Sequence, residues 1–309
     1  MGNIPSFDQR MVGFFNHLRN ASRQGKHSPT EIIELDHCLN ELRLFKSSAE
    51  IKAMRRAADI SAHAHIRAMQ FTQPGKWEYQ VEAEIIHHFM QNDCRSPAYP
   101  SIVGGGENGC ILHYIENNHK LKNNDLLLID AGAEYDYYAG DITRTFPVNG
   151  KFTPAQKTLY SIVLKAQKAA IAAVKPGNHW NQPHEEAVRV LTEGLLEVGL
   201  LEGQLDALIE EQAYREFYMH RTGHWLGMDV HDVGDYKVGG QWRVLEPGMV
   251  LTVEPGLYIR NLDHVPKKWH FIGIRIEDDV LVTKTGHEVL SAAAPKEVDD
   301  IEALMAAAG

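Results

Sequence analysis

Five residues in the second half of the chain have the types and surroundings expected of a site for two metal ions: Asp130, Asp141, His224, Glu254 and Glu277. Each of the four acids lies in or beside a short apolar run, with a glycine or a second acid next to it. Burying four carboxylates together without positive charge would cost more free energy than a fold can supply. Two divalent cations would neutralise them, so the pattern predicts a dinuclear metal centre.

Taken one at a time, these residues have ordinary explanations. A single Asp130 or Asp141 would more often end a strand or cap a turn, and Glu254 precedes a Pro-Gly pair that is typical of a turn. A single His224 would more often be a hydrogen-bonded core residue. The four acids together, in matching strand contexts and with the histidine, favour a metal site over these separate explanations.

The donor types indicate which metals and which reaction to expect. Oxygen-rich sites with one imidazole suit manganese, iron(II), cobalt or zinc better than a metal that needs thiolates. A pair of such ions can hold a bridging hydroxide at neutral pH, polarise a carbonyl group and stabilise the oxyanion that forms on it. The residues therefore predict metal-assisted hydrolysis of an amide or an ester.

The histidines of one glycine-interrupted segment need separate roles. His220, His224 and His231 do not have the spacing of the helical zinc motif His-Glu-x-x-His. We expect His224 to be the ligand, and His220 and His231 to face the substrate and donate to a developing oxyanion. Several other polar residues are interpreted as solvated: Asp278, Asp279, His63, His65, His87 and His88.

Bulk composition limits the function classes. The 309 residues carry a formal net charge of −10 and no run rich in Lys or Arg, which argues against nucleic acid as a partner. The cysteines, Cys38, Cys94 and Cys110, form no Cys-x-x-Cys pair, which favours a reducing compartment. Neither a signal peptide nor an apolar run long enough to span a bilayer is evident. The predicted location is the cytoplasm, with no membrane partner.

Hydrophobic periodicity predicts a mixture of helices and strands, and hence an α+β fold. A polar connector is expected over 23–45, and Ser47 with Glu50 has the spacing of a capping box at a helix start. Helices are predicted at 7–22, 47–70, 78–92, 154–174, 182–199, 204–213 and 297–308. Strands are predicted at 100–103, 110–115, 125–131, 137–147, 216–220, 249–259 and 272–283.

The chain contains a weak internal repeat. The apolar run that ends in Asp130-Ala-Gly matches the run that ends in Glu254-Pro-Gly, and each is followed by a second strand bearing an acid. This predicts two related halves, each with a curved antiparallel sheet and outer helices, that supply two carboxylates each to one cleft. Because side chains alternate along a strand, Arg275 should face the cleft beside Glu277, and Ile276 the core.

The ordered motifs resemble those of one family, the Xaa-Pro aminopeptidases (aminopeptidase P), which are metallopeptidases with the pita-bread fold. The resemblance runs from about Glu41 to the C-terminus. It rests on Glu-Asn-Gly-Cys-Ile-Leu-His113-Tyr, Asp130-Ala-Gly, Gly-Asp141-Ile-Thr-Arg-Thr-Phe-Pro, His224-Trp-Leu-Gly, Val-His231-Asp-Val-Gly, Thr-Val-Glu254-Pro-Gly-Leu-Tyr and Arg275-Ile-Glu277-Asp-Asp. It implies two divalent metal ions, with manganese the expected metal, and peptide substrates with proline at the second position.

The resemblance also implies a role for each residue. Asp141 and Glu277 would bridge both metals. Asp130 would complete the coordination of the second metal, and His224 with Glu254 that of the first. Glu254 would also relay a proton from the attacking water. The substrate pocket would be lined by His113, His220 and His231, with the catalytic roles assigned to Glu254, His220 and His231, and with Arg275 supporting the site and the substrate.

Two departures from the family pattern affect these expectations. Bacterial members usually carry a large additional N-terminal domain, and residues 1–45 resemble only its final helix and linker, followed by a catalytic domain over 46–309. Formation of a homo-oligomer, to which that domain contributes, is therefore expected to be weakened. Arg221 stands where a glycine often follows the first histidine of its motif, which should alter the rim of the pocket.

Other functions remain open on the sequence. A Xaa-Pro dipeptidase has a similar arrangement of ligands, and a peptide with proline at position two that is longer than a dipeptide would separate the two activities. Methionine aminopeptidase fits the segment from His224 to His231 less well. A non-catalytic pita-bread module that only binds peptides is the alternative from another class, but such proteins typically lose metal ligands, and none is lost here.

Overall fold

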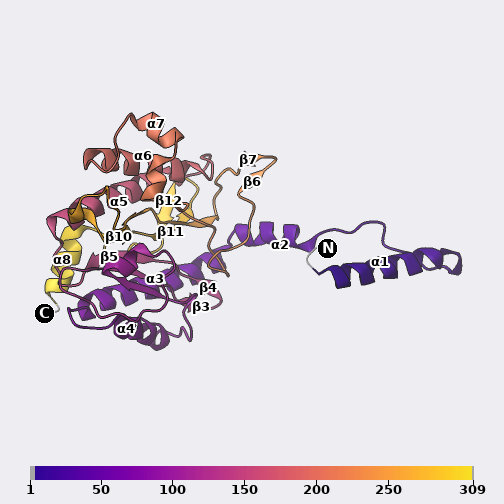
Figure 1. Cartoon of the computed structure of the whole chain (residues 1–309). Helices are drawn as coiled ribbons and strands as arrows, with labels where there is room; N and C mark the ends of the chain where they lie inside the picture. Colours follow the sequence, from indigo (N-terminus) through magenta and orange to yellow (C-terminus); the bar gives the residue numbers. More distant parts are fainter. Residues whose placement is uncertain (1–3, 308–309) are drawn as a thin grey trace. The chain divides into compact units, whose positions relative to one another are not determined.

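The computed structural model describes residues 4–307 and divides into two compact units, Met1–Leu42 and Arg43–Gly309 (Figure 1). The expected boundary, after residue 45, lies close to this division. That the first unit is the remnant of a larger domain stays a prediction. All the residues expected to form the site belong to the second unit.

The first unit begins with helix α1 (Pro5–Asn20), whose proline occupies the first turn, where a missing N–H costs nothing. A short 3-10 turn, η1 (Ser22–Gln24), follows. The connector predicted over 23–45 is wrong at its end, because α2 (Leu35–Leu44) is helical. Leu35, Leu39 and Leu42 recur at spacings of four and three, which is the period of a helical face.

The helices of the second unit start at recognisable caps. The predicted capping box is present at α3 (Ser48–Phe71), where Ser47 and Glu50 exchange side-chain and backbone hydrogen bonds. Thr153 with Gln156 forms the same box at α5 (Pro154–Ala173). The other helices agree with the periodicity within a few residues. The helices are α4 (Glu78–Gln91), α5 (Pro154–Ala173), α6 (Gln182–Glu197), α7 (Leu205–Glu210) and α8 (Val298–Ala306).

The strands form small antiparallel sheets. One sheet has the order β1 (Ile102–Gly105), β2 (Leu126–Asp130), β5 (Thr143–Pro147). A second has the order β12 (His287–Val289), β11 (Asp278–Val282), β8 (Val250–Val253), and β9 (Gly256–Ile259) pairs with β10 (Ile272–Arg275). Two short hairpins are β3 (Glu134–Tyr135) with β4 (Tyr138–Ala139), and β6 (Lys237–Val238) with β7 (Gln241–Trp242).

The internal repeat corresponds to real geometry. In the first half β2 pairs with β5, and in the second β8 pairs with β11, both antiparallel. Helices α3 and α4 lie on one side of the strands and α5 and α6 on the other (Figure 1). The strands are apolar and largely buried between these layers. This is the α+β, two-half arrangement that the sequence predicts.

Three predicted strands are interrupted, and two are wrong. The run 249–259 breaks at Glu254-Pro255, because proline has no N–H to donate to a ladder, and the runs 137–147 and 272–283 break beside Asp141 and Glu277. An acid lies at or beside each break. Residues 110–115 and 216–220 are not strands: η2 (Gly106–Cys110) and η3 (Ala213–Glu216) are 3-10 turns that lead into loops.

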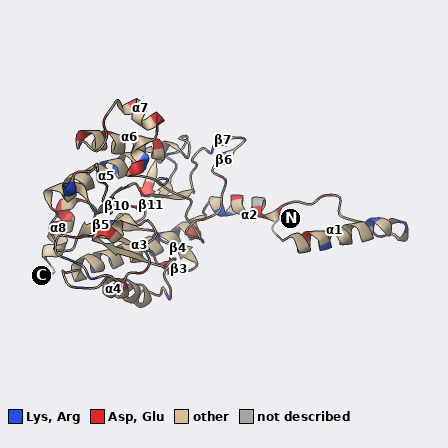
Figure 2. Cartoon of the chain, in the orientation of Figure 1, with Lys and Arg blue, Asp and Glu red and all other residues tan. Residues whose placement is uncertain are grey.

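Charged positions are distributed over many elements. Figure 2 shows Lys and Arg scattered along the chain rather than gathered on one helix, with acidic positions among them. Several exposed pairs join them, such as Arg55 with Glu288 at 2.7 Å. Among residues 4–307, no helix is long and apolar enough to cross a membrane.

Candidate metal centre

A cavity of about 660 Å³ in the second unit is lined by all five residues expected to bind metal. The other residues assigned to the site from the sequence line it too: His113, His220, His231 and Arg275. The two halves of the fold contribute to the same wall. The sequence therefore identified one shared location from positions up to 164 residues apart (113 to 277).

Strand ends position the four acids. Asp130 is the last residue of β2, and Asp141 lies two residues before β5, which pairs with it. Glu254 directly follows β8, and Glu277 directly precedes its partner β11. Each antiparallel pair thus places two acids at one end. The internal repeat in the sequence therefore corresponds to two strand pairs that each contribute two acids to the cavity.

Hydrogen bonds join the two halves at this point. The backbone N–H of Glu277 donates to the carbonyl oxygen of Thr143 at 3.0 Å, and the Thr143 hydroxyl donates to Glu277 Oε2 at 2.6 Å. Thr143 belongs to the first half and Glu277 to the second. The relative position of the two pairs of acids is therefore fixed by direct bonds between β5 and the segment before β11.

Three of the expected ligands form the tightest group. Ligand atoms of Asp141, His224 and Glu277 all lie within 4.8 Å of one another, an arrangement that could hold a metal ion. His224 Nε2 is 3.3 Å from Asp141 Oδ2 and 3.7 Å from Glu254 Oε1. Asp130 lies in the same cavity and accepts a hydrogen bond from Arg275 Nη2 at 2.6 Å.

The electrostatics show how crowded these carboxylates are. Burial raises the pKa of Glu254 to about 7, and the charges of Asp141 and Asp130 act in the same direction against His224 and Arg275. Burial, followed by the neighbouring acids, also raises the pKa of Glu277 well above its ordinary value. Burial would lower the pKa of His224, but its hydrogen bond to Asp141 and the charges of Asp141 and Glu254 raise it to about 9.

This donor set fits divalent cations. It consists of carboxylate oxygens with one imidazole, the ligands that hard and borderline ions prefer. Among the residues that line the cavity, two carry a guanidinium group, Arg221 and Arg275. Cations would replace the protons that the raised pKa values of Glu254 and Glu277 otherwise retain.

Two tyrosines belong to the site and were missed by the sequence analysis. The Tyr99 hydroxyl lies 2.6 Å from Asp130 Oδ1 and 2.6 Å from Asp141 Oδ1, although it has one proton to donate. The Tyr258 hydroxyl accepts from Arg275 Nη1 at 3.0 Å. The sequence around each tyrosine does not predict a role in the site, because tertiary packing places both side chains there. Tyr258 alone belongs to a motif quoted from the sequence, the one that begins before Glu254.

His220 takes part in a chain of hydrogen bonds. Its Nδ1 is 2.7 Å from the carbonyl oxygen of Arg221, so this nitrogen carries the proton, and Nε2 accepts from the Tyr258 hydroxyl at 2.8 Å. Burial, reinforced by Arg275, lowers the pKa of His220 to about 3. The imidazole is therefore neutral, with both nitrogens engaged. His231 lies against His224, with ring centroids 4.3 Å apart.

Comparison with known proteins decides the family. The model of metallopeptidase family M24 matches residues 52–284. The chain belongs to metallopeptidase family M24. Its two halves with antiparallel strands and outer helices are accordingly the pita-bread fold of that family, and the resemblance to the Xaa-Pro aminopeptidases is confirmed.

Individual relatives are similar over nearly the whole chain. A Xaa-Pro aminopeptidase of Haemophilus influenzae is 54% identical over 276 residues, which are 89% of this chain and 64% of the relative. The human Xaa-Pro dipeptidase is 38% identical over 302 residues, with 86% of this chain and 61% of the relative covered. The solved structure of the Pseudomonas aeruginosa aminopeptidase PepP superposes with a TM-score of 0.95 at 57% identity, covering 100% of this chain and 70% of that one. The chain thus spans less than two thirds of the length of these two curated relatives.

The prediction that the two acids after Glu277 are solvated is wrong. Asp278 and Asp279 are buried rather than solvated. Asp278 accepts from Arg144 Nη2 at 2.7 Å and from Lys296 Nζ at 2.6 Å, and these charges lower its pKa to about 2 although burial acts in the opposite direction. Asp279 accepts from the backbone N–H of Asp141 at 3.2 Å. Both faces of β11 are covered, so adjacent residues are buried together.

One histidine assigned to a solvated helix face is also buried. His65 of α3 donates from Nε2 to the carbonyl oxygen of Ala131, 3.0 Å away, directly after Asp130. Burial lowers its pKa to about 4, so the ring is neutral. The amphipathic pattern of α3 is blurred by its many alanines, which allow close packing on a wider face than the sequence indicates. The other three histidines of these pairs are not fully buried.

The loop that carries His113 is held by a buried carboxylate that the sequence analysis did not single out. Glu78, at the start of α4, accepts from the Gly105 backbone N–H at 2.8 Å and from Asn108 Nδ2 at 3.0 Å. Its other oxygen accepts from the Tyr114 hydroxyl at 2.7 Å and from the His119 backbone N–H at 2.8 Å. One side chain therefore organises both ends of this loop.

Glu78→Ala is expected to lower the free energy of unfolding by about 3–5 kcal/mol, because it leaves several buried donors without an acceptor. Urea denaturation followed by fluorescence measures the change. Glu82→Ala on the same helix, where the side chain is only partly buried, is the matched control and should cost less than about 0.5 kcal/mol. Equal effects of the two substitutions would contradict the role given to Glu78.

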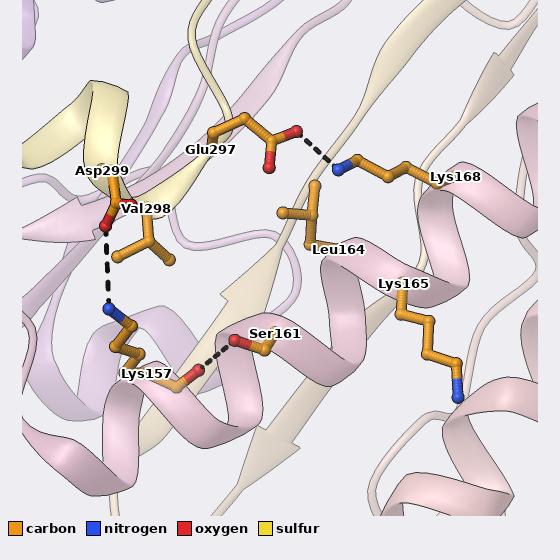
Figure 3. Close-up of a pocket in the computed structure, with 8 residues that line it drawn as sticks. All are labelled: Lys157, Ser161, Leu164, Lys165, Lys168, Glu297, Val298 and Asp299. Carbon is orange, nitrogen blue, oxygen red and sulfur yellow. Dashed lines mark hydrogen bonds and ion pairs between the residues drawn. The ribbon is translucent and has the colours of Figure 1, made fainter.

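A second hollow of about 440 Å³ lies between α5 and the start of α8, away from the M24 cavity. Figure 3 shows that two of its lysines face acidic partners, with Lys168 joined to Glu297 and Lys157 to Asp299, whereas Lys165 points away from both acids. The first of these distances is 2.6 Å and the second 3.7 Å. Among the described residues that line this groove there is no group of donors that could hold a metal ion, so it is not an alternative metal site.

Proposed function

We propose that this chain is a metal-dependent aminopeptidase that hydrolyses the bond between the first residue of a peptide and a following proline. The observation that carries the proposal is the single cavity in which five potential ligands lie beside three histidines and Arg275. The similarity to a Xaa-Pro aminopeptidase at 54% identity supports it. The catalytic domain is the second unit, which begins at Arg43.

The proposed centre holds two divalent ions, with manganese the expected metal. Asp141 and Glu277 would contact both ions, Asp130 one of them, and His224 with Glu254 the other. This division is supported by the short distance between His224 Nε2 and Glu254 Oε1, 3.7 Å, and by the tight grouping of Asp141, His224 and Glu277. When bound, the metal supplies activation of water and polarisation of the scissile carbonyl.

The chain's own side chains would bind, orient and move protons. Glu254 Oε2, 3.8 Å from His220 Nδ1, takes up the proton released from water and returns it to the leaving nitrogen. Asp130 attracts the free α-amine of the peptide, and Arg275 holds this carboxylate in place. His231 and His113 donate to the developing oxyanion. His220 was expected from the sequence to donate to it as well, but both of its nitrogens are engaged, so it keeps Tyr258 and Arg221 in position instead.

Preference for proline is reasonable on physical grounds. A Xaa-Pro bond has no N–H, so a site that receives it needs no acceptor for that group. The cavity has apolar residues, including Ile102, Leu112 and Val230, against which a pyrrolidine ring could pack. The substrates are therefore proposed to be peptides with proline at position two, hydrolysed in the cytoplasm.

A Xaa-Pro dipeptidase is the second candidate, supported by the 38% identity to the human enzyme of that name. The higher identity to an aminopeptidase, 54%, favours the first proposal. With the manganese-loaded protein, kcat/KM for Ala-Pro-Leu is expected to exceed that for Ala-Pro by about tenfold or more, a difference of about 1.4 kcal/mol in transition-state stabilisation. Release of alanine, followed by chromatography, measures both rates. Faster cleavage of the dipeptide would instead assign the chain to the dipeptidases.

A further inference from the structure

Two cations lie on one aromatic ring at the cavity. In the β6–β7 hairpin Lys237 pairs directly with Trp242, and the Lys237 Nζ is 4.2 Å from the centroid of the Trp242 ring. Arg221 Cζ is 5.3 Å from the same ring. Arg221 and Trp242 both line the cavity that contains the proposed ligands. The ring therefore holds two positive charges close to the substrate space.

These charges are not neutralised by ion pairs. Among residues 4–307, neither Arg221 nor Lys237 has a carboxylate oxygen within 4.0 Å. Arg221 Nη2 instead donates to Asn181 Oδ1, and Asn181 Nδ2 donates to Glu185 Oε1 at 2.6 Å. The guanidinium is thus oriented by a neutral amide and an aromatic ring, which leaves other N–H groups free for a ligand. Two like charges on one ring favour an anion between them.

The hairpin has a well-defined turn. Gly239 and Gly240 connect β6 to β7 with φ values of +58° and +81°, the left-handed conformation that a two-residue hairpin turn requires and that glycine adopts without strain. Trp242 and Lys237 are therefore presented by a regular hairpin. The two cations come from separate segments, the loop after His220 and this hairpin, and meet at Trp242.

Charge complementarity identifies the group that would bind there. A short peptide carries a positive amine at one end and a negative carboxylate at the other. The amine is attracted to the acids around Asp130 and repelled by Arg221, so the C-terminal carboxylate is the substrate group of matching sign. Asp130, which would attract the amine, is bonded to Tyr99. Arg221 follows His220, whose Nδ1 is 3.8 Å from Glu254 Oε2. The group expected to attract the amine and the group expected to attract the carboxylate thus have different neighbours in the site.

We propose that Arg221 and Lys237, oriented by Trp242, form a subsite for the C-terminal carboxylate of short peptides. This inference rests on the proposed peptidase function and adds a substrate class to it, namely peptides with a free carboxylate shortly after the proline. Arginine binds a carboxylate with two parallel hydrogen bonds, and lysine supplies a second, less directional charge.

Calorimetric titration with the dipeptide Pro-Leu and with Pro-Leu amide tests the subsite on the manganese-loaded full chain. Neither peptide has a Xaa-Pro bond to cleave, and the two differ only in the carboxylate. The wild-type protein should bind the free acid about tenfold more tightly, the effect of one charge-assisted interaction. Arg221→Gln should reduce this ratio to below about twofold, and Lys237→Gln should reduce it partly.

Lys268→Gln is the matched control, because Lys268 also lies over a tryptophan ring, that of Trp269 at 4.6 Å, but does not line the cavity. Its ratio should equal that of the wild type. Equal affinity of the wild type for acid and amide, no binding of either peptide, or an unchanged ratio in Arg221→Gln would each overturn the proposal.

Cleavage of Ala-Pro-Leu amide by the same preparations tests the peptidase function separately. Cleavage with an unchanged binding ratio would refute the subsite and leave the function intact. A ratio that depends on Arg221 without any cleavage would support the carboxylate subsite and refute the function on which it was built.

Discussion

Asp141→Ala and Glu277→Ala are each expected to abolish cleavage before proline, with kcat/KM lowered by about 10³-fold or more. Each carboxylate is proposed to contact both ions, so its removal weakens the binding of both ions at once. Loss of metal-assisted stabilisation of several kcal/mol corresponds to a rate loss of this size. Release of the first residue from Ala-Pro-Leu in excess manganese, combined with metal analysis of the dialysed proteins, measures both consequences.

Asp235→Ala is the control for these substitutions and should retain activity, because Asp235 is exposed and does not line the cavity, although its neighbour Tyr236 does. A damaged fold would be a different explanation for lost activity, and melting temperatures separate the two. After chelation, Glu277→Ala should melt at or above the temperature of the wild type, because it removes a carboxylate whose pKa burial and neighbouring acids raise. Near-normal activity of either Asp141→Ala or Glu277→Ala would contradict their assignment as shared ligands.

Removal of metal is expected to destabilise the protein by about 4 kcal/mol relative to a solution with metal at about a thousand times its dissociation constant. Ions that bind only the folded chain add RT ln(1 + [M]/Kd) to its stability, and without them the acids of the cavity repel one another. Thermal unfolding with manganese and with chelator measures the difference. An unchanged melting temperature would contradict the presence of a site that requires countercharge.

The size of this metal effect should depend on pH. In the chelated protein the pKa of Glu254 is raised to about 7 from an ordinary value of 4.5, and that of Glu277 is raised as well. The folded chain then holds protons that the unfolded chain releases, so the stability that Glu254 contributes is fully present below pH 4.5 and is lost as pH rises through 7. The gain in melting temperature on adding manganese should therefore be larger at pH 8 than at pH 5.5, and an equal gain would contradict this explanation.

The sequence predicted that the four acids lie in one cavity because local pattern and long-range arrangement agree at those positions. Each acid ends or precedes a buried strand, and the repeat of this pattern predicts that the two halves place Asp130, Asp141, Glu254 and Glu277 together. The helices were predictable from capping boxes such as Ser47 with Glu50. Assigning metals and substrate roles to these residues remains a proposal.

Residues that support the site were not predictable, because their partners are distant in sequence. Tyr99 bridges Asp130 and Asp141 from an irregular segment, and Glu78 reaches a loop that begins 27 residues later. Asp278 was predicted to be solvated, whereas β11 is covered on both faces and β5 supplies Arg144 as a partner for that charge. Only packing reveals such partners.

The most direct test of the central claim is release of alanine from Ala-Pro-Leu by protein stripped with chelator and then supplied with manganese. We predict no release from the stripped protein, and activity that rises with added manganese until about two ions are bound per chain. Two bound ions without cleavage would contradict the peptidase proposal and favour a module that only binds peptides, and cleavage that persists without metal would contradict the metal centre itself.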